Sequence, residues 1–148
     1  MKISARARYG LAAIIAMAEE QNEDECITII SLSEKLKISK IYLEQVFALL
    51  KRGEIVISTK GAKGGYSLSK PTSKITIYDI LYAIESSLFE KTEKTVEESD
   101  LYLENCMQEN IFNIIDDSIR DKLINITLED IVNKLSRYKN NQNYMYYL

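Results

Sequence analysis

The first apolar positions of the chain repeat at helical spacing. Leu11, Ile14, Ile15 and Ala18 follow one another at intervals that place them on one face of an α-helix. This pattern predicts a helix over residues 4–20, followed by a solvated acidic loop. Basic residues before an apolar run also occur in secretory signal peptides, but the amphipathic pattern favours a helix of the folded protein.

Two further helices are predicted by serine caps. Ser31 and Glu34 have the spacing of a capping box, in which the serine accepts from the backbone and the glutamate reaches back. They predict a short helix that starts at Ser31 and runs through Leu36. Ser39 then caps a helix over residues 40–52, after a tight connection.

The third predicted helix has an apolar side and a polar side. Its apolar stripe consists of Leu43, Val46, Phe47 and Leu50. The residues that fall largely on the other side are Lys40, Tyr42, Glu44 and Gln45. Gly53 follows the last helical residue, where a C′ glycine ends a helix. We therefore expect the helix to be buried along one side only.

A β-hairpin with a glycine-rich loop is predicted next. Residues 55–58 and 66–69 are typical of short strands, and residues 59–65 between them contain three glycines with Lys60 and Lys63. Pro71, the single proline of the chain, closes the hairpin. Three helices followed directly by such a hairpin predict a winged helix-turn-helix.

The chain after the hairpin is predicted to be helical apart from one linker. Thr76 and Asp79 open a helix that extends to about Glu85, and residues 90–99 are polar and charged. From Leu101 a long helix has apolar residues at alternating three- and four-residue spacing, which is typical of a helix that packs on another helix. Its seam residues are Leu103, Met107, Ile111, Ile114, Ile115 and Ile119.

A short helix and an aromatic tail are predicted at the end of the chain. Thr127 and Asp130 cap a helix through Leu135, and residues 140–143 form a polar spacer. The tail after this spacer is Tyr144, Met145, Tyr146, Tyr147 and Leu148. A bulky apolar tail needs a covering surface, either on a partner protein or on the protein's own helices.

Together these elements predict a mainly α protein with a small β-hairpin wing. We expect a winged helix-turn-helix DNA-binding domain over residues 1–86 and a linker over residues 87–99. Dimerisation helices are expected over residues 100–139, and a C-terminal tail over residues 140–148.

Net charge is distributed unevenly along the chain. The total is −3, but residues 1–80 contain 12 lysines and arginines against 9 acidic residues, a charge of +3. Residues 81–148 contain 7 against 13, a charge of −6. This asymmetry indicates a basic half that binds nucleic acid and an acidic half that serves assembly.

The residue types present argue against an enzyme. The chain has no histidine for acid–base work, no metal-ligand spacing and no nucleophile beside a base. Two distant cysteines, Cys26 and Cys106, fit a reducing cytoplasm better than a disulfide framework. We expect no metal and no cofactor, and we expect Cys106 to be buried beside the helix seam.

The candidate DNA contacts come from three segments. The helix that starts at Lys40 fits a major groove, the wing loop can reach an adjacent phosphate or minor groove, and the start of the first helix can add phosphate contacts. The candidates are Lys2, Ser4, Arg6, Arg8, Tyr9, Ser39, Lys40, Tyr42, Glu44, Gln45, Lys60, Gly61 and Lys63. Taken singly, each of these is equally well a solvated surface residue. The glycine loop lacks the spacing of a nucleotide-binding P-loop.

Several motifs in fixed order resemble the Rrf2 family of bacterial regulators, which includes the IscR, NsrR and CymR proteins. They are residues 2–4 with 8–11, residues 42–45, Lys60-Gly61 with residues 64–66, Ile75-Thr76 and residues 126–130. The resemblance covers nearly the whole chain and implies a homodimer that binds a dyad-symmetric operator. An arginine is common before the first wing glycine in the family, whereas this chain has Lys60.

Within that family the chain is similar to the cluster-free CymR branch. Cluster-binding members use three cysteines near the start of the long helix, where this chain has only Cys106. The resemblance implies a repressor of cysteine and sulfur genes that binds cysteine synthase, with the tail from Tyr144 to Leu148 as the contact. The alternatives are a redox- or metabolite-responsive regulator of another regulon, with Cys26 as the redox residue, and a winged-helix adaptor without DNA binding.

Overall fold

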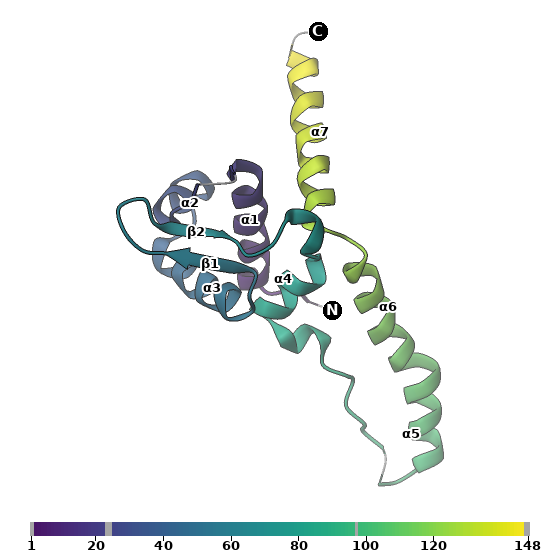
Figure 1. Cartoon of the computed structure of the whole chain (residues 1–148). Helices are drawn as coiled ribbons and strands as arrows, with labels where there is room; N and C mark the ends of the chain where they lie inside the picture. The colour runs from purple at the N-terminus through teal and green to yellow at the C-terminus, as the bar shows by residue number, and fades with distance from the viewer. Residues whose placement is uncertain (1, 23–24, 97, 147–148) are drawn as a thin grey trace.

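The computed structural model describes the backbone of residues 2–22, 25–96 and 98–146, and the surroundings of side chains up to residue 143. The N-terminal part contains α1 (Ala5–Glu20), α2 (Ile29–Leu36), α3 (Lys40–Arg52), β1 (Val56–Thr59), β2 (Gly65–Leu68), the 3-10 helix η1 (Thr72–Lys74) and α4 (Ile77–Ile84). After them come the 3-10 helix η2 (Ser86–Phe89), α5 (Leu101–Met107), the π-helical turn η3 (Gln108–Phe112), α6 (Asn113–Ile124) and α7 (Leu128–Tyr146). The predicted mainly α fold with a β-hairpin wing is confirmed (Figure 1).

Serines cap the N-termini of α1 and α3, and Ser39 is the predicted cap of α3. The Ser4 hydroxyl accepts from the Ala7 N–H, and the Ser39 hydroxyl accepts from the Tyr42 N–H. The predicted start of α2 at Ser31 is wrong, because Thr28 is its N-cap and accepts from the Ser31 N–H at 3.1 Å. Ser31 lies inside the first turn, where its own hydroxyl donates to the Thr28 carbonyl.

The wing strands are each displaced by one residue from their predicted bounds. β1 and β2 pair antiparallel with Val56 opposite Leu68. Ile55 is not a strand residue because its N–H donates to the Leu50 carbonyl at the end of α3. Ile27 adds a third short segment to the hairpin, exchanging two backbone hydrogen bonds of 2.8 Å with Tyr66. The wing is therefore joined to the chain between α1 and α2.

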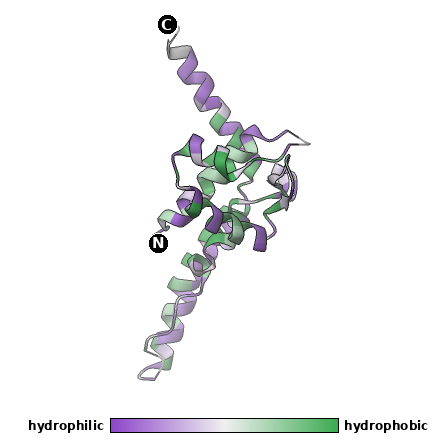
Figure 2. Ribbon diagram, turned by 90° about the vertical axis from the view of Figure 1, so that its left-hand side faces the viewer, coloured by the Kyte–Doolittle hydropathy of each residue, from purple (hydrophilic) through white to green (hydrophobic). Residues whose placement is uncertain are grey.

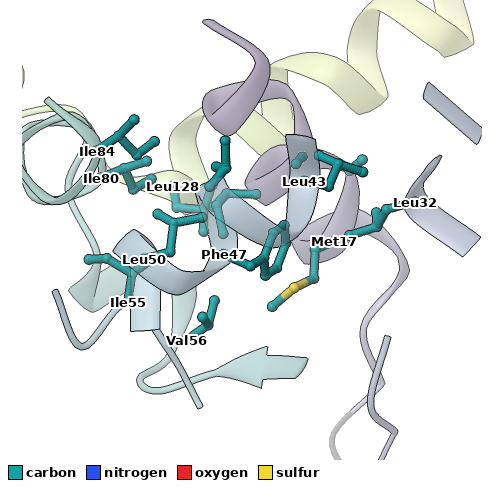
Figure 3. Packing of buried hydrophobic residues seen from close by; sticks show 14 of the residues in the cluster. Met17, Leu32, Leu43, Phe47, Leu50, Ile55, Val56, Ile80, Ile84 and Leu128 are labelled. Atoms are coloured by element: carbon teal, nitrogen blue, oxygen red, sulfur yellow. The ribbon is translucent and has the colours of Figure 1, made fainter. Parts of the chain in front are cut away.

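The core lies between α1, α3, α4 and the base of the wing. The predicted stripe of α3 is fully buried there, and Phe47 is its largest member. Leu128, at the start of α7, is also fully buried among these residues (Figure 3). The capping box at Thr127 and Asp130 therefore begins α7 inside the N-terminal core, with reciprocal hydrogen bonds of 2.9 and 3.1 Å.

The C-terminal helices extend away from this core in two directions (Figure 1). α5, η3 and α6 follow without a break, which confirms a long helix from Leu101. The predicted end of the last helix at Leu135 is wrong, because α7 continues to Tyr146. Residues 136–143 are polar but contain neither glycine nor proline, so no helix-breaking residue ends α7 in this stretch. In the described part of the chain, no helix is long and apolar enough to cross a membrane.

Candidate nucleic-acid interface

The exposed side of α3 carries the predicted polar residues. Lys40, Glu44 and Gln45 are exposed, whereas Tyr42 is half-buried against the core. The Lys40 ammonium lies 3.7 Å from the Glu44 carboxylate, and both side chains are more than half exposed. Such a surface pair exchanges easily for contacts to DNA, since exposed ion pairs contribute little stability.

Ile41 is a candidate that the sequence reasoning missed. It lies on the first turn of α3 and its side chain is 70% exposed. An apolar side chain in this position can contact the methyl group of a thymine in a major groove. The signal was present in the sequence, because Ile41 is apolar but falls outside the stripe that contains Leu43 and Val46.

The start of α1 lies beside α3 through an aromatic pair. The Tyr9 ring meets the Tyr42 ring edge to face, with centroids 5.6 Å apart. Arg6 and Arg8 on the same segment are exposed. Ser4 differs from its neighbours, because its hydroxyl caps α1 and also donates to the Glu85 carboxylate after α4. The structure therefore uses the Ser4 side chain for internal bonds.

The wing loop is exposed and shaped by glycine. Lys60, Gly61 and Lys63 are exposed, and the Gly64 N–H donates to the Gly61 carbonyl at 3.0 Å. Gly61 has φ +107°, a conformation that L-residues rarely adopt, while a Cβ there would meet no atom within 4 Å. Backbone conformation, and not lack of space, therefore requires glycine at this position.

The base of the wing is held against α3. The Tyr66 ring packs on Phe47 of α3 with centroids 4.9 Å apart. The Gln21 side chain at the end of α1 accepts from the Leu68 N–H at 3.1 Å. These contacts fix the wing relative to α3.

Within the described residues, the cations at Lys2, Arg6, Arg8, Lys60 and Lys63 have no ion-pair partner.

The predicted seam of the long helix is largely open to solvent in the single chain. Leu103, Ile111, Ile114 and Ile115 are exposed to 49–58%, and Met107 and Ile119 are half-buried. Apolar residues are visible along this helix in Figure 2. Soluble proteins rarely leave such a row of large apolar side chains uncovered.

The two cysteines lie in different surroundings. Cys26 is half-buried beside the wing, 3.2 Å from the point that a Cβ on Gly65 would occupy. Cys106 is exposed in the single chain, as are the seam residues Leu103 and Ile111, so its expected burial between two copies stays a prediction. The side chains of the tail residues Tyr144, Met145, Tyr146, Tyr147 and Leu148 lie outside the described part of the chain, and the backbone of the first three belongs to α7.

Comparison with known proteins gives one consistent family. Residues 3–134 match the family model Rrf2, described as an iron-dependent transcriptional regulator. The transcriptional regulator IscR of Pectobacterium atrosepticum is 31% identical over 133 residues, which are 90% of this chain and 80% of that protein.

Two solved structures are similar over most of both chains. CymR, the global cysteine regulator of B. subtilis, has 28% identity and a TM-score of 0.72, covering 90% of this chain and 98% of its own. T. potens IscR has 28% identity and a TM-score of 0.73, covering 99% and 96%.

Iron, which the family description implies, does not fit the donor set of this chain. Iron–sulfur clusters are held mainly by cysteine thiolates, typically four ligands in all. Cys106 is the single cysteine of the long helix, Cys26 lies at the wing, and the sequence contains no histidine. Among the described residues, no group of three histidine, cysteine or acidic side chains could hold a metal ion.

Fold, interface and sequence relationship lead to the same conclusion. The helix α3 has one exposed polar side, and the wing that follows packs on it through Tyr66. Among the described residues, Lys60 and Lys63 of the wing have no ion-pair partner. The family match spans the whole of this unit and most of the helices after it. The chain belongs to the Rrf2 family of winged-helix, DNA-binding transcriptional regulators, which are not enzymes.

Proposed function

We propose that α3 lies in the major groove of an operator, with Lys40, Glu44 and Gln45 near base edges. The observation that carries this assignment is the single exposed polar side of α3 above a fully buried stripe. The neighbouring cations at the start of α1 and in the wing loop supply phosphate contacts. Ser4 contributes through its position at the N-terminus of α1, since its hydroxyl is already bonded.

The DNA-bound form is a homodimer that reads a dyad-symmetric site. The exposed apolar row on α5 and α6 supports this arrangement, because a second copy of the same helix would cover it. Two recognition helices related by a two-fold axis then meet two half-sites of the operator.

The wing assignment is tested by salt dependence. The wild-type protein selects a duplex from a random pool, and its affinity is measured over a range of salt concentrations. Each phosphate that a lysine neutralises adds about 0.9 to the steepness of the plot of log affinity against log salt. We expect the double variant Lys60→Ala, Lys63→Ala to give a slope shallower by about twice this amount. The control Lys122→Ala, Lys134→Ala removes two exposed lysines of α6 and α7 and keeps the wild-type slope. Equal slopes for the two double variants would contradict the assignment.

The regulated genes are those of cysteine and sulfur metabolism, and the protein represses them. The similarity to the global cysteine regulator of B. subtilis supports this proposal. The partner is cysteine synthase, which binds the aromatic, apolar segment from Tyr144 to Leu148.

Calorimetry with cysteine synthase of the same organism tests this partner. We expect the full-length protein to bind, a variant without residues 144–148 not to bind, and O-acetylserine to relieve the binding. No binding by either form would remove the partner and leave the DNA-binding dimer standing.

A second candidate signal is oxidation of Cys26. Its place beside Gly65 at the base of the wing supports it, because a bulkier oxidised sulfur there would press on the wing. Mild peroxide followed by mass spectrometry tests the idea, with Cys106 as the exposed internal control. An unmodified Cys26 together with unchanged DNA binding would remove it.

A further inference from the structure

A cavity of about 180 Å³ lies where the winged-helix unit meets the long helix. Its walls come from α4, from residues 88–91 at the end of η2 and directly after it, and from the first two turns of α6. Sites for drug-sized ligands measure roughly 300–1,000 Å³. This cavity therefore suits a smaller metabolite.

One wall of the cavity is aromatic. Tyr78 and Phe89 pack with ring centroids 4.6 Å apart, and the Arg120 guanidinium lies 5.7 Å from the centre of the Tyr78 ring. The half-buried side chains of Leu88 and Ile119 extend this apolar lining. Such a surface accepts an aliphatic or aromatic side chain.

The polar lining carries charges of both signs that are not paired with each other. Lys91 and Arg120 are the cations, and Glu90 and Asp117 are carboxylates. Within the described residues none of these four groups forms an ion pair, so no cation lies within 4 Å of a carboxylate. The unpaired cations can therefore bind a ligand's carboxylate, and the unpaired carboxylates can bind an ammonium group of the same ligand.

The other two polar residues of the lining, Asp116 and Asn113, form hydrogen bonds within the protein. The Asp116 carboxylate accepts from the Thr92 N–H at 3.1 Å and from its hydroxyl at 3.3 Å. This contact holds the chain after η2 against α6. The Asn113 side-chain oxygen accepts from the Gln108 side-chain amide at 2.9 Å across the π-helical turn η3. π-helical turns inside α-helices occur frequently at functional sites.

We propose that this cavity binds a free α-amino acid with an apolar side chain. Arg120 and Lys91 receive its carboxylate, Asp117 and Glu90 receive its ammonium group, and its side chain lies against Tyr78 and Phe89. The ligand is a direct effector of DNA binding, a role that rests on the proposed function.

Because α4 contacts both the cavity and α3, a ligand bound in the cavity can affect α3, the proposed recognition helix. Tyr78 stacks on Tyr82 of the same helix with centroids 5.6 Å apart. Ala83 of α4 lies so close to the end of α3 that a Cβ on Gly53 would be 2.4 Å from its Cβ. A ligand that joins α4 to α6 therefore constrains the angle between α3 and the dimerisation helix.

Calorimetry of the full-length protein tests the site without DNA. The probes are L-leucine, L-methionine and L-phenylalanine, each at millimolar concentration. For L-leucine, 4-methylpentanoate lacks the ammonium group and 3-methylbutylamine lacks the carboxylate. We expect at least one of the three amino acids to bind. We expect 4-methylpentanoate and 3-methylbutylamine each to bind more weakly than L-leucine.

Two exposed arginines provide a matched pair of variants. Arg120→Gln removes the guanidinium at the cavity, and we expect it to weaken binding by about tenfold to a hundredfold. Arg137→Gln on α7 removes an exposed guanidinium outside the cavity and keeps the wild-type affinity. Thermal unfolding checks that both variants remain folded.

Three results would overturn the proposal. They are no binding of any of the three amino acids, equal binding by the single-charge analogues, and unchanged affinity in Arg120→Gln. Amino-acid binding that leaves the affinity for the selected duplex unchanged would overturn the effector role. Loss of DNA binding in every sample, with amino-acid binding retained, would instead count against the proposed function alone.

Discussion

Gly53 has a different structural role from the one that its position in the sequence predicts. The sequence predicts that Gly53 ends α3 as a C′ glycine, and such glycines commonly have a left-handed backbone. Gly53 instead has φ −79°, and the left-handed residue is Glu54, with φ 57°. Glycine is required at residue 53 because a Cβ there would lie 2.4 Å from the Ala83 Cβ. The helix end is therefore determined by its contact with α4.

Gly53→Ala tests this explanation. We expect a loss of about 1–3 kcal/mol in the free energy of unfolding, because the added methyl group overpacks the contact with Ala83. Urea unfolding measures it, and Ala83→Gly in the same chain recovers part of the loss. Glu54→Gly is the contrasting variant. It places glycine at the left-handed position, where glycine is unstrained, and we expect no loss in the free energy of unfolding. Additive losses for Gly53→Ala and Ala83→Gly would contradict the contact.

Glu44 is expected to read sequence more than to supply affinity. In Glu44→Ala a carboxylate that can accept from a cytosine amino group is removed, while Lys40 is freed from its partner at 3.7 Å. We expect discrimination at one base pair to fall by about 1–3 kcal/mol, with total affinity maintained. Selection from a random pool followed by sequencing measures this, and Glu34→Ala on α2 is the exposed control. A uniform loss of affinity across sequences would show that Glu44 does not read a base.

At the scale of elements, ion pairs connect α7 with the helix-turn-helix. The Lys139 ammonium on α7 donates to the Glu19 carboxylate on α1, and Lys35 on α2 lies 3.6 Å from the same carboxylate. Lys35 also pairs with Glu20. The hydrogen bond from Lys139 is the main reason why the pKa of Glu19 is lowered from 4.5, with further lowering by the charges of Lys139 and Lys35. The last helix is thus tied to the first two.

Lys139→Ala is expected to reduce stability in a pH-dependent way. The lowered pKa of Glu19 means that the folded state favours its charged form, so this stabilisation is present above pH 4.5 and disappears as pH falls through the lowered value. For such a surface pair we expect roughly 0.2–1 kcal/mol at neutral pH. Urea unfolding between neutral pH and about pH 3 measures it, with Lys122→Ala as the control. If the wild-type protein and Lys139→Ala differ as much in free energy of unfolding at about pH 3 as at neutral pH, the pair of Lys139 with Glu19 is not the cause.

At the scale of the whole molecule, the chain has a compact N-terminal core and two helical extensions (Figure 1). The extension formed by α5 and α6 keeps its apolar row exposed, because no other part of the described chain covers it. The buried Glu104 carboxylate holds residues 95 and 96 beside this helix through backbone hydrogen bonds of 3.2 and 2.8 Å. One side of the helix is therefore occupied by its own chain, and the apolar row stays exposed on another side, where the proposed second copy would pack.

Ile114→Asp tests this arrangement. Ile114 is 58% exposed in the single chain, so the variant folds, but a charge at the seam between two copies is unfavourable. We expect a monomer by analytical ultracentrifugation and a loss of affinity for the selected duplex of about a hundredfold or more. Ile30→Asp, at an exposed isoleucine on α2, remains dimeric. A dimeric Ile114→Asp protein would place the interface elsewhere.

The sequence by itself determined the features that depend on neighbouring residues. The caps at Ser39, at Thr76 with Asp79 and at Thr127 with Asp130 form as predicted, because a cap involves groups only three residues apart. The apolar stripe of α3 was readable for the same reason, since helical periodicity needs no knowledge of the partner surface. These local signals were sufficient for the winged helix-turn-helix.

The tertiary structure alone decided the features that join distant segments. Leu128 completes the N-terminal core, and Ile27 pairs with Tyr66 across the base of the wing. The cavity beside Tyr78 is lined by residues of α6 as far along the chain as Arg120. No periodicity or cap encodes such contacts, because they depend on how helices pack after they have formed. The sequence therefore determined the elements and the family, and packing decided which side chains meet.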